Sequence, residues 1–198
     1  MKAFFFLIAI VAAANVCFAQ DFNKAMATAK TSYSAGKLED AHFALQQAMQ
    51  EVDLTIGKEV LKLLPPKMGT MQSTAKDDNV SSNVGFVGAT IRRSYAQAKQ
   101  SADVIIIDNS PLIAMTNAIL NTPMLGMMSH GKDKIVKVQG YKGRLEKQTG
   151  STADKNSYEL QIPLGSALFT FKVTDCTDSQ ILELADAIPL QQIAKLIE

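Results

Sequence analysis

The sequence has 198 residues, of which 20 are basic and 19 are acidic, and 47% are hydrophobic. A chain of this length can form one substantial domain, or a domain with an appendage. The near-neutral, well-mixed charge argues against a nucleic-acid-binding protein, because such proteins cluster Lys and Arg against phosphates.

Residues 1–19 have the pattern of a secretory signal peptide. Lys2 supplies one positive charge, residues 3–14 are an uninterrupted apolar run, and small residues precede the expected cleavage point. The apolar run has the length of a signal-peptide core, and it is shorter than the roughly 20 residues that span a bilayer. We therefore expect cleavage between Ala19 and Gln20. The exported protein is then periplasmic or secreted and has no transmembrane segment.

Cleavage would remove Cys17 and leave Cys176 as the one cysteine of the exported chain. A single cysteine cannot close an internal disulfide, so the fold is expected to depend on its hydrophobic core alone. Lys2 is the only charged residue in the removed segment, so the remaining chain has equal numbers of basic and acidic residues.

Residues 20–64 predict a helical hairpin, because apolar residues recur at helical spacing in two runs. Gly36 lies between the runs and suits the left-handed conformation that ends many helices. Pro65-Pro66 ends the second run. The second run places the following residues on one stripe: Leu38, Ala41, Leu45, Ala48, Val52, Ile56, Val60 and Leu63.

The sequence Gly36-Lys37-Leu38-Glu39-Asp40-Ala41, followed by Leu45 and Ala48, resembles the turn and second helix of a tetratricopeptide repeat. The resemblance covers residues 22–48, and the first helix departs from it at Ala25 and Thr28, where large apolar residues are usual. No second copy follows in the sequence, and a solenoid needs about three repeats for stability. An ordinary helical hairpin is therefore preferred over a peptide-binding repeat array.

Residues 65–84 are rich in Pro, Gly, Ser, Thr and Asn, which predicts a linker. Residues 85–198 then predict an α+β domain. Within it, Val104–Ile107 is apolar on both faces, as a covered central strand would be. Gly165-Ser166 suits the centre of a two-residue hairpin turn.

The same domain also contains sequence signals for the starts of helices. Asn109 or Ser110 is expected to cap a helix with Pro111 at its first position. A helical pattern returns from about Asp178, and Pro189 restarts a short final helix. The segments 135–139 and 141–147 predict two strands, close enough across Gly140 to be one bent strand.

The order of these elements predicts an α+β fold: an N-terminal helical hairpin, then a mainly antiparallel sheet of about five to six strands with helices packed on one face. The order also resembles a family of uncharacterised exported bacterial proteins. Asp108-Asn109-Ser110-Pro111-Leu112 and Asn121-Thr122-Pro123-Met124-Leu125 look like the helix start and stop of that family. The resemblance covers most of residues 38–198, concerns structural caps, and implies no assigned activity.

Catalytic residues are sparse. Cys176 opens the last helix, where a helix N-terminus could lower the pKa of a thiol, yet a buried, inert cysteine is the preferred interpretation. His42 lies one residue off the apolar stripe of its helix, which favours a surface or boundary position. Asp108 follows a strand, as active-site acids often do, and is expected to cap the next helix instead. We therefore predict a protein that is not an enzyme and has no cofactor.

The methionine-rich segment is the one chemically unusual stretch. Met124, Met127, Met128 and His130 combine thioethers with an imidazole, ligands that suit Cu(I). Met68 and Met71 of the predicted linker could add a second arm. Because methionine also fills irregular apolar gaps, copper binding by a periplasmic protein is kept as the alternative function.

Residues 112–128 are apolar along nearly their whole length, more than one buried stripe of a short helix requires. This excess is either buried between the sheet and the N-terminal hairpin, which is the preferred interpretation, or exposed as a patch for a lipid, a peptide or a partner. We predict an exported, non-enzymatic binding or accessory protein of the cell envelope, which would use the exposed part of this segment. Its partner would be an envelope protein, a peptide or an apolar ligand, and not nucleic acid.

Overall fold

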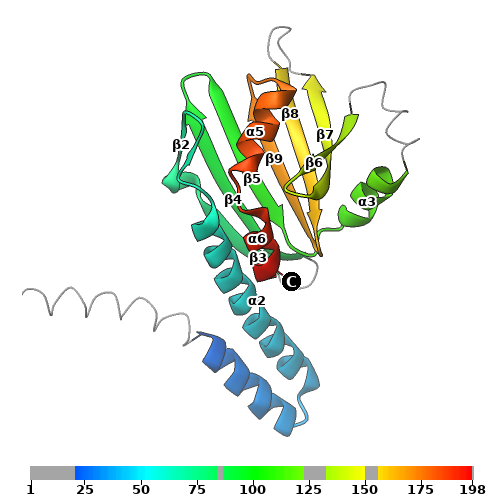
Figure 1. Cartoon of the computed structure of the whole chain (residues 1–198). Helices are drawn as coiled ribbons and strands as arrows, with labels where there is room; N and C mark the ends of the chain where they lie inside the picture. The colour runs from blue at the N-terminus through cyan, green and yellow to red at the C-terminus, as the bar shows by residue number, and fades with distance from the viewer. Residues whose placement is uncertain (1–20, 84–86, 123–132, 150–155, 198) are drawn as a thin grey trace, which may run out of the picture. The chain divides into compact units, whose positions relative to one another are not determined.

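The computed structural model describes residues 21–83, 87–122, 133–149 and 156–197. The chain divides after Thr55 into two units, which are described separately below. Helices and one large antiparallel sheet confirm the predicted α+β class (Figure 1).

The first unit is a helical hairpin, as predicted. A helix over residues 21–34 is followed by a turn and by the first part of α2 (Leu38–Leu63). Gly36 lies in the turn with a φ of 73°, the left-handed conformation that glycine adopts without strain. The buried residues among those described in this unit are all alanines: Ala25, Ala29, Ala41, Ala44 and Ala48. Small side chains allow the two helices to approach closely.

The second unit is built on one nine-stranded antiparallel sheet. The strands run in the order β1-β2-β4-β5-β9-β8-β7-β6, and β3 also pairs with β4. Their bounds are β1 Lys67–Met68, β2 Met71–Ser73, β3 Asn79–Asn83, β4 Val87–Gln97, β5 Gln100–Ile107, β6 Asp133–Val138, β7 Tyr141–Thr149, β8 Asn156–Leu164 and β9 Ala167–Thr174.

The predicted strand number of five to six and the predicted linker at residues 65–84 are both wrong. That segment holds the short strands β1, β2 and β3 and the 3₁₀ turn η1 (Ala75–Asp77). The segment is rich in turn-forming residues, but β2 and β3 both form antiparallel hydrogen bonds with β4. Long-range pairing therefore turns a segment without periodicity into part of the sheet.

Two-residue turns join β8 to β9 and β6 to β7. Gly165, with a φ of 60°, and Ser166 join β8 to β9, which confirms the predicted hairpin. Gln139 and Gly140 both have positive φ, so β6 and β7 form a hairpin rather than one bent strand. β5 lies between β4 and β9, which confirms Val104–Ile107 as part of a central strand.

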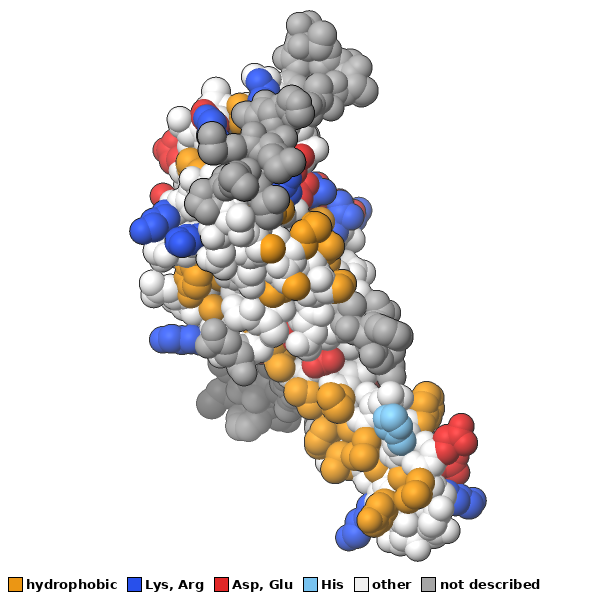
Figure 2. Space-filling view, turned by 90° about the vertical axis from the view of Figure 1, so that its right-hand side faces the viewer, with side chains coloured by type: hydrophobic (Ala, Val, Ile, Leu, Met, Phe, Trp, Pro, Cys, Tyr) orange, Lys and Arg blue, Asp and Glu red, His pale blue; other side chains and the backbone are white. Residues whose placement is uncertain are grey.

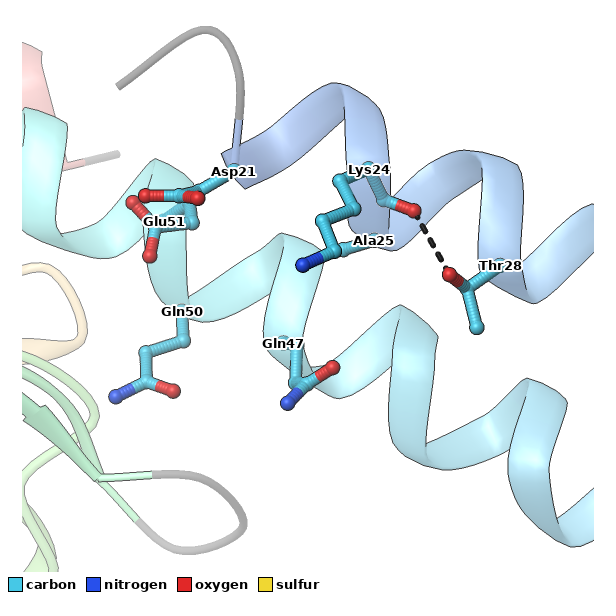
Figure 3. A pocket seen from close by; sticks show the side chains of 7 residues that line it. All are labelled: Asp21, Lys24, Ala25, Thr28, Gln47, Gln50 and Glu51. Carbon is cyan, nitrogen blue, oxygen red and sulfur yellow. Dashed lines mark hydrogen bonds between the residues drawn. The ribbon is translucent and has the colours of Figure 1, made fainter. Parts of the chain in front are cut away.

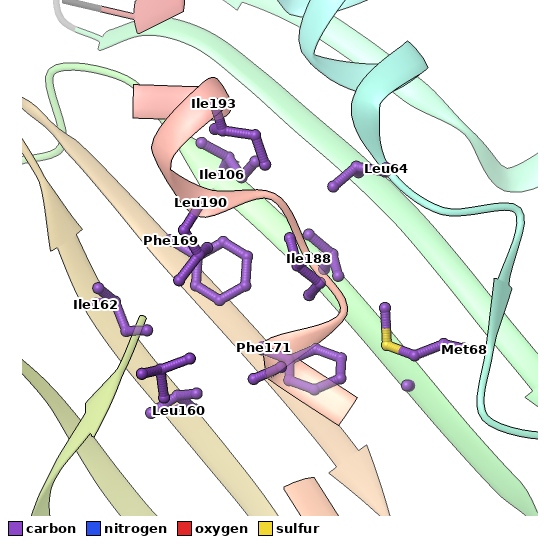
Figure 4. Close-up of a cluster of buried hydrophobic side chains, with 14 of the residues drawn as sticks. Leu64, Met68, Ile106, Leu160, Ile162, Phe169, Phe171, Ile188, Leu190 and Ile193 are labelled. Carbon is purple, nitrogen blue, oxygen red and sulfur yellow. The ribbon is translucent and has the colours of Figure 1, made fainter. Parts of the chain in front are cut away.

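The hydrophobic core lies on one face of the sheet (Figure 4). Phe169 and Phe171 of β9 are fully buried, with ring centroids 6.4 Å apart. α6 (Leu190–Ile197) lies across them and contributes Leu190 and Ile193 to the core. Burial of a large apolar side chain contributes roughly 1.5–3 kcal/mol. This core therefore supplies the main stabilisation of a unit that has no disulfide among its described residues.

Three helices share that face of the sheet, as predicted. α5 (Asp178–Asp186) begins with a capping box, in which Thr177 accepts from the Gln180 amide and Gln180 accepts from the Thr177 amide. This confirms the predicted helix start at about Asp178. α5, α6 and the end of α2 all bury residues in the one core cluster, including Ile181, Ile193 and Val60.

The helix α3 (Ile113–Asn121) departs from the prediction in two ways. It begins two residues after Pro111, so that proline lies in the preceding turn, where the Ser110 hydroxyl accepts from the Leu112 amide. Its buried residues Thr116 and Leu120 lie outside the main core cluster, although α3 contacts β7 and β8. The expectation that the helices share one face therefore fails for α3.

Candidate functional site

The predicted copper ligands Met124, Met127, Met128 and His130 lie outside the described residues, so their arrangement stays a prediction. The proposed second arm is wrong. Met68 and Met71 are fully buried in the hydrophobic core, where their thioethers pack against apolar side chains. In the described ranges, no three His, Cys, Asp or Glu side chains gather closely enough to hold a metal ion.

Cys176 is buried between the end of β9 and the cap of α5, as preferred from the sequence. Its thiol donates to the carbonyl of Val173 at 3.5 Å. Burial raises the pKa of Cys176 to about 11, because the apolar surroundings disfavour the thiolate. The helix N-terminus therefore does not activate this thiol. His42, by contrast, is exposed on α2.

Asp108 ties two turns together rather than serving an open site. One carboxylate oxygen accepts from the Asn109 amide at 2.8 Å and from the Ser166 hydroxyl at 2.9 Å. Gly88 leaves space for the other oxygen, which would lie 2.6 Å from a Cβ added at that glycine. The role of Asp108 is therefore local capping of the turn before α3.

Charged side chains form a row of alternating sign on the sheet face opposite the core. Arg92 pairs with Asp103, Lys172 pairs with Glu159, and Arg144 pairs with both Asp133 and Glu146, with N–O distances of 2.8 to 3.1 Å. Asp103 and Lys172 are also cross-strand neighbours. Each basic residue in this row has an acidic partner, so the row offers no excess positive charge to phosphates.

A polar pocket of about 250 Å³ lies between the two helices of the hairpin (Figure 3). Asp21 and Glu51 place their carboxylates side by side at one end, and Lys24 and Gln47 lie farther along. The Thr28 hydroxyl is used within its own helix, where it donates to the Lys24 carbonyl at 3.0 Å. Asp21 and Glu51 are fewer than the three His, Cys, Asp or Glu side chains that would mark a metal-holding group, and the lining residues include no nucleophile beside a base.

A second pocket of about 390 Å³ lies between the β6–β7 turn and α6. Gly140, Tyr141 and Lys195 line it. The Gln139 amide, which also lines it, donates to the carbonyls of Asp186 and Ile188 at 3.0 and 2.7 Å. Gln139 thereby fastens the turn to the connection between α5 and α6, so its role is structural.

Among the described residues, the largest apolar surface lies on the helical hairpin (Figure 2). On the first helix, exposed apolar residues flank Ala25 and Ala29, and on α2 they flank Ala41 and Ala48. Since the helices run antiparallel and each stripe lies on the matching side of its alanines, both stripes open to the same side. We name this surface the hairpin face, and its residues are Phe22, Met26, Tyr33, Leu38, Leu45, Met49 and Val52.

Sequence reasoning missed the hairpin face. Leu38, Leu45 and Val52 belong to the predicted apolar stripe of α2, yet they are 63%, 46% and 44% exposed. The first helix contributes only alanines to the buried contact with α2. It therefore covers the alanines of the α2 stripe and leaves the large side chains of that stripe exposed to solvent. The sequence did carry a signal. Ala25 and Thr28 stand where a tetratricopeptide repeat has large apolar residues, which indicates that little apolar surface is buried between the two helices.

The surface predicted at residues 112–128 is partly described. Leu112 and Met115 are 44% and 55% exposed, whereas Thr116 and Leu120 are buried. Residues 123–128 lie outside the described ranges. The described part of this segment therefore exposes two large hydrophobic side chains, a smaller surface than the hairpin face.

The described helices include none that is both long enough and apolar enough to cross a bilayer. No protein-family model, curated protein sequence or solved structure matches the chain. The resemblances to a tetratricopeptide hairpin and to exported bacterial proteins therefore stay predictions, and the functional argument depends on the surface of this chain alone.

Proposed function

We propose that this protein is an exported, non-catalytic binding module of the bacterial cell envelope, and that it contacts a macromolecular partner through the hairpin face. The observation that carries the proposal is the exposure of seven large apolar side chains on one side of two adjacent helices. Such exposure is unfavourable in water unless another surface covers it.

The sheet unit does not need these side chains for its own stability. Its core cluster is drawn from residues beginning with Val60, and the cluster contains no residue of the hairpin face. An apolar surface that the main core does not use is typical of an interaction site. The signal-peptide pattern supports the envelope as the place of action.

Two candidate catalytic residues that the structure describes, Cys176 and Asp108, also favour a binding role. Cys176 is buried as a neutral thiol, and Asp108 is committed to the turn that it caps. Neither is paired with a base that could activate a nucleophile. A binding role is therefore better supported than hydrolysis or group transfer.

Cysteine labelling in cells tests the proposal. The variant Met49→Cys places a thiol on the hairpin face. Phe43→Cys places one on the same helix, about 120° around the axis from Met49 and about 140–180° from the other residues of the face on α2. Phe43 and Met49 are 58% and 66% exposed, so the two sites are matched in access. A membrane-permeant maleimide is applied to intact producing cells and to diluted purified protein.

We expect Met49→Cys to label at least about tenfold more slowly in cells than after purification and dilution, since a bound partner excludes the reagent. Phe43→Cys should label at the same rate in both states. Equal labelling of the two variants in cells would overturn the proposal, because the hairpin face would then be open in the native setting.

A further inference from the structure

We infer that the partner at the hairpin face is a second copy of this chain, so that two hairpins pair face to face as a four-helix bundle. The inference rests on the proposed function and names its partner. The area of the face, the thin interior of the hairpin, and the spacing and charge of its residues all favour a second copy.

The area of the face fits a dimer. At roughly 150–200 Å² for each fully exposed large side chain, the observed fractions leave about 550–730 Å² of the hairpin face open to water. The largest apolar patch on an ordinary monomer is about 300–600 Å². A stable protein–protein interface buries about 800 Å² on each partner, so this face is close to the required size.

The interior of the hairpin is too thin to form a core alone. Its buried residues are alanines, so contact between the helices removes little apolar surface from water. Helix bundles normally bury large side chains between facing helices. A second hairpin would bury Leu45, Met49 and their neighbours, and would complete the core that one hairpin lacks.

The spacing of the face also suits helix–helix packing. Leu38, Leu45 and Val52 are seven residues apart along α2, and Met26 and Tyr33 are seven apart on the first helix. This repeat keeps a seam facing a partner helix. The exposed apolar side chains of the two helices lie on either side of the buried alanines, which leaves a groove between them. The apolar stripe of one copy can pack into the groove of another. Such a patch is self-complementary, as a two-fold interface requires.

The charge of the hairpin favours protein over lipid. Residues 21–55 contain three lysines and five acidic residues, so the segment is slightly acidic. Amphipathic helices that bind anionic membranes carry lysine and arginine on their polar face. The small net charge also imposes little repulsion between two copies. We therefore favour a second copy over a membrane surface.

Sedimentation of the purified exported protein tests the inference. We expect a dimer at micromolar concentration. Leu45→Glu and Met49→Glu should each weaken dimerisation at least about tenfold, because each would bury a charge at the centre of the interface. Phe43→Glu is the matched control, since it adds the same charge to an exposed position of the same helix away from the face. Circular dichroism confirms that each variant keeps its helices.

The outcomes separate the two proposals. A monomer at all concentrations whose Met49→Cys variant is nonetheless protected in cells would overturn the dimer and leave the binding module intact. A monomer that cosediments with vesicles of phosphatidylglycerol and phosphatidylethanolamine would likewise overturn the dimer, in favour of lipid. A dimer that Phe43→Glu disrupts as strongly as Leu45→Glu would contradict the assignment of the face.

Discussion

Arg93 and Asp78 form a two-pronged ion pair, with N–O distances of 2.9 and 2.7 Å, although β4 carries the arginine and the aspartate precedes β3. The third donor of Arg93 reaches the carbonyl of Leu64 at 2.6 Å, just after the last residue of α2. Both side chains are about 85% buried. The pair therefore joins the end of α2 to the sheet, and the hydrogen bonds with Asp78 hold the pKa of Arg93 above its ordinary value.

We predict that Asp78→Asn lowers the free energy of unfolding by about 2–3 kcal/mol, because it leaves a largely buried guanidinium without its counter-charge. Arg93→Lys should also destabilise, since an ammonium group cannot make the two parallel bonds. Urea unfolding measures both. The double variant Arg93→Met with Asp78→Leu should recover most of the loss. An unchanged urea midpoint for Asp78→Asn would contradict this account.

The second prediction concerns alkaline pH. Tyr95 is buried, and burial raises its pKa to about 12 from an ordinary value of 10.0. A raised folded-state pKa contributes stability that is present below pH 10 and is lost as pH rises through 12. The parent protein should therefore lose roughly 2 kcal/mol more than Tyr95→Phe between pH 10 and 12.

Near neutral pH the parent protein should be more stable than Tyr95→Phe. The Tyr95 hydroxyl donates to the Pro65 carbonyl at 2.8 Å, so Tyr95→Phe should cost about 1 kcal/mol there. Cys176 contributes in the same alkaline direction in both proteins, so it cancels in the difference. Tyr33→Phe, at an exposed position of the hairpin, is the control. Parallel alkaline curves for Tyr95→Phe and the parent would refute the prediction.

The accuracy of the sequence predictions followed the strength of local signals. The start of α5 at about Asp178, the Gly165-Ser166 turn and the apolar strand at Val104–Ile107 were all predicted, because each depends on neighbouring residues. Strands β1 and β2 have two and three residues, too few for an alternating pattern. They form where β4 offers a partner, which no local pattern encodes.

Long-range contacts also explain the failures at individual residues. β4 pairs on both sides, and Arg93 is largely buried by its ion pair with Asp78, a contact that no local pattern indicates. The hairpin face was missed because periodicity shows which residues share a stripe, but it does not show how much of that stripe the neighbouring helix covers. The candidate site was therefore predictable as two amphipathic helices, but not as an exposed surface.

The third prediction concerns Gly57, in the last part of α2. A Cβ at this position would lie 2.5 Å from Cγ1 of Val80 and 3.2 Å from Cγ1 of Ile91. Alanine would gain about 1 kcal/mol of helix propensity over glycine. We expect the clash to exceed that gain, so that Gly57→Ala is destabilising and Gly57→Ala with Val80→Ala recovers part of the loss. A stabilised Gly57→Ala variant would show that α2 and β3 are less closely packed.

The fourth prediction concerns export. Protein expressed with its own N-terminus in a bacterial host should appear outside the cytoplasm with Gln20 as its first residue, which intact-mass measurement checks. Replacing Ala19 by a bulky residue such as Ala19→Phe should block processing, since cleavage requires a small residue there. A heavier processed product from Ala19→Phe would place the cleavage point before residue 19. A processed product of unchanged mass would show that cleavage before Gln20 does not require a small residue at position 19.

The last prediction joins export to the buried thiol. If residues 1–19 are removed, unfolded protein should react with one equivalent of a thiol reagent, since Cys17 is lost and Cys176 remains. The folded protein should react very slowly at pH 8, because burial and a pKa of about 11 leave little thiolate. The rate should rise steeply toward pH 11. A fast reaction of folded protein at pH 8, absent in Cys176→Ser, would show that the end of β9 opens readily to solvent.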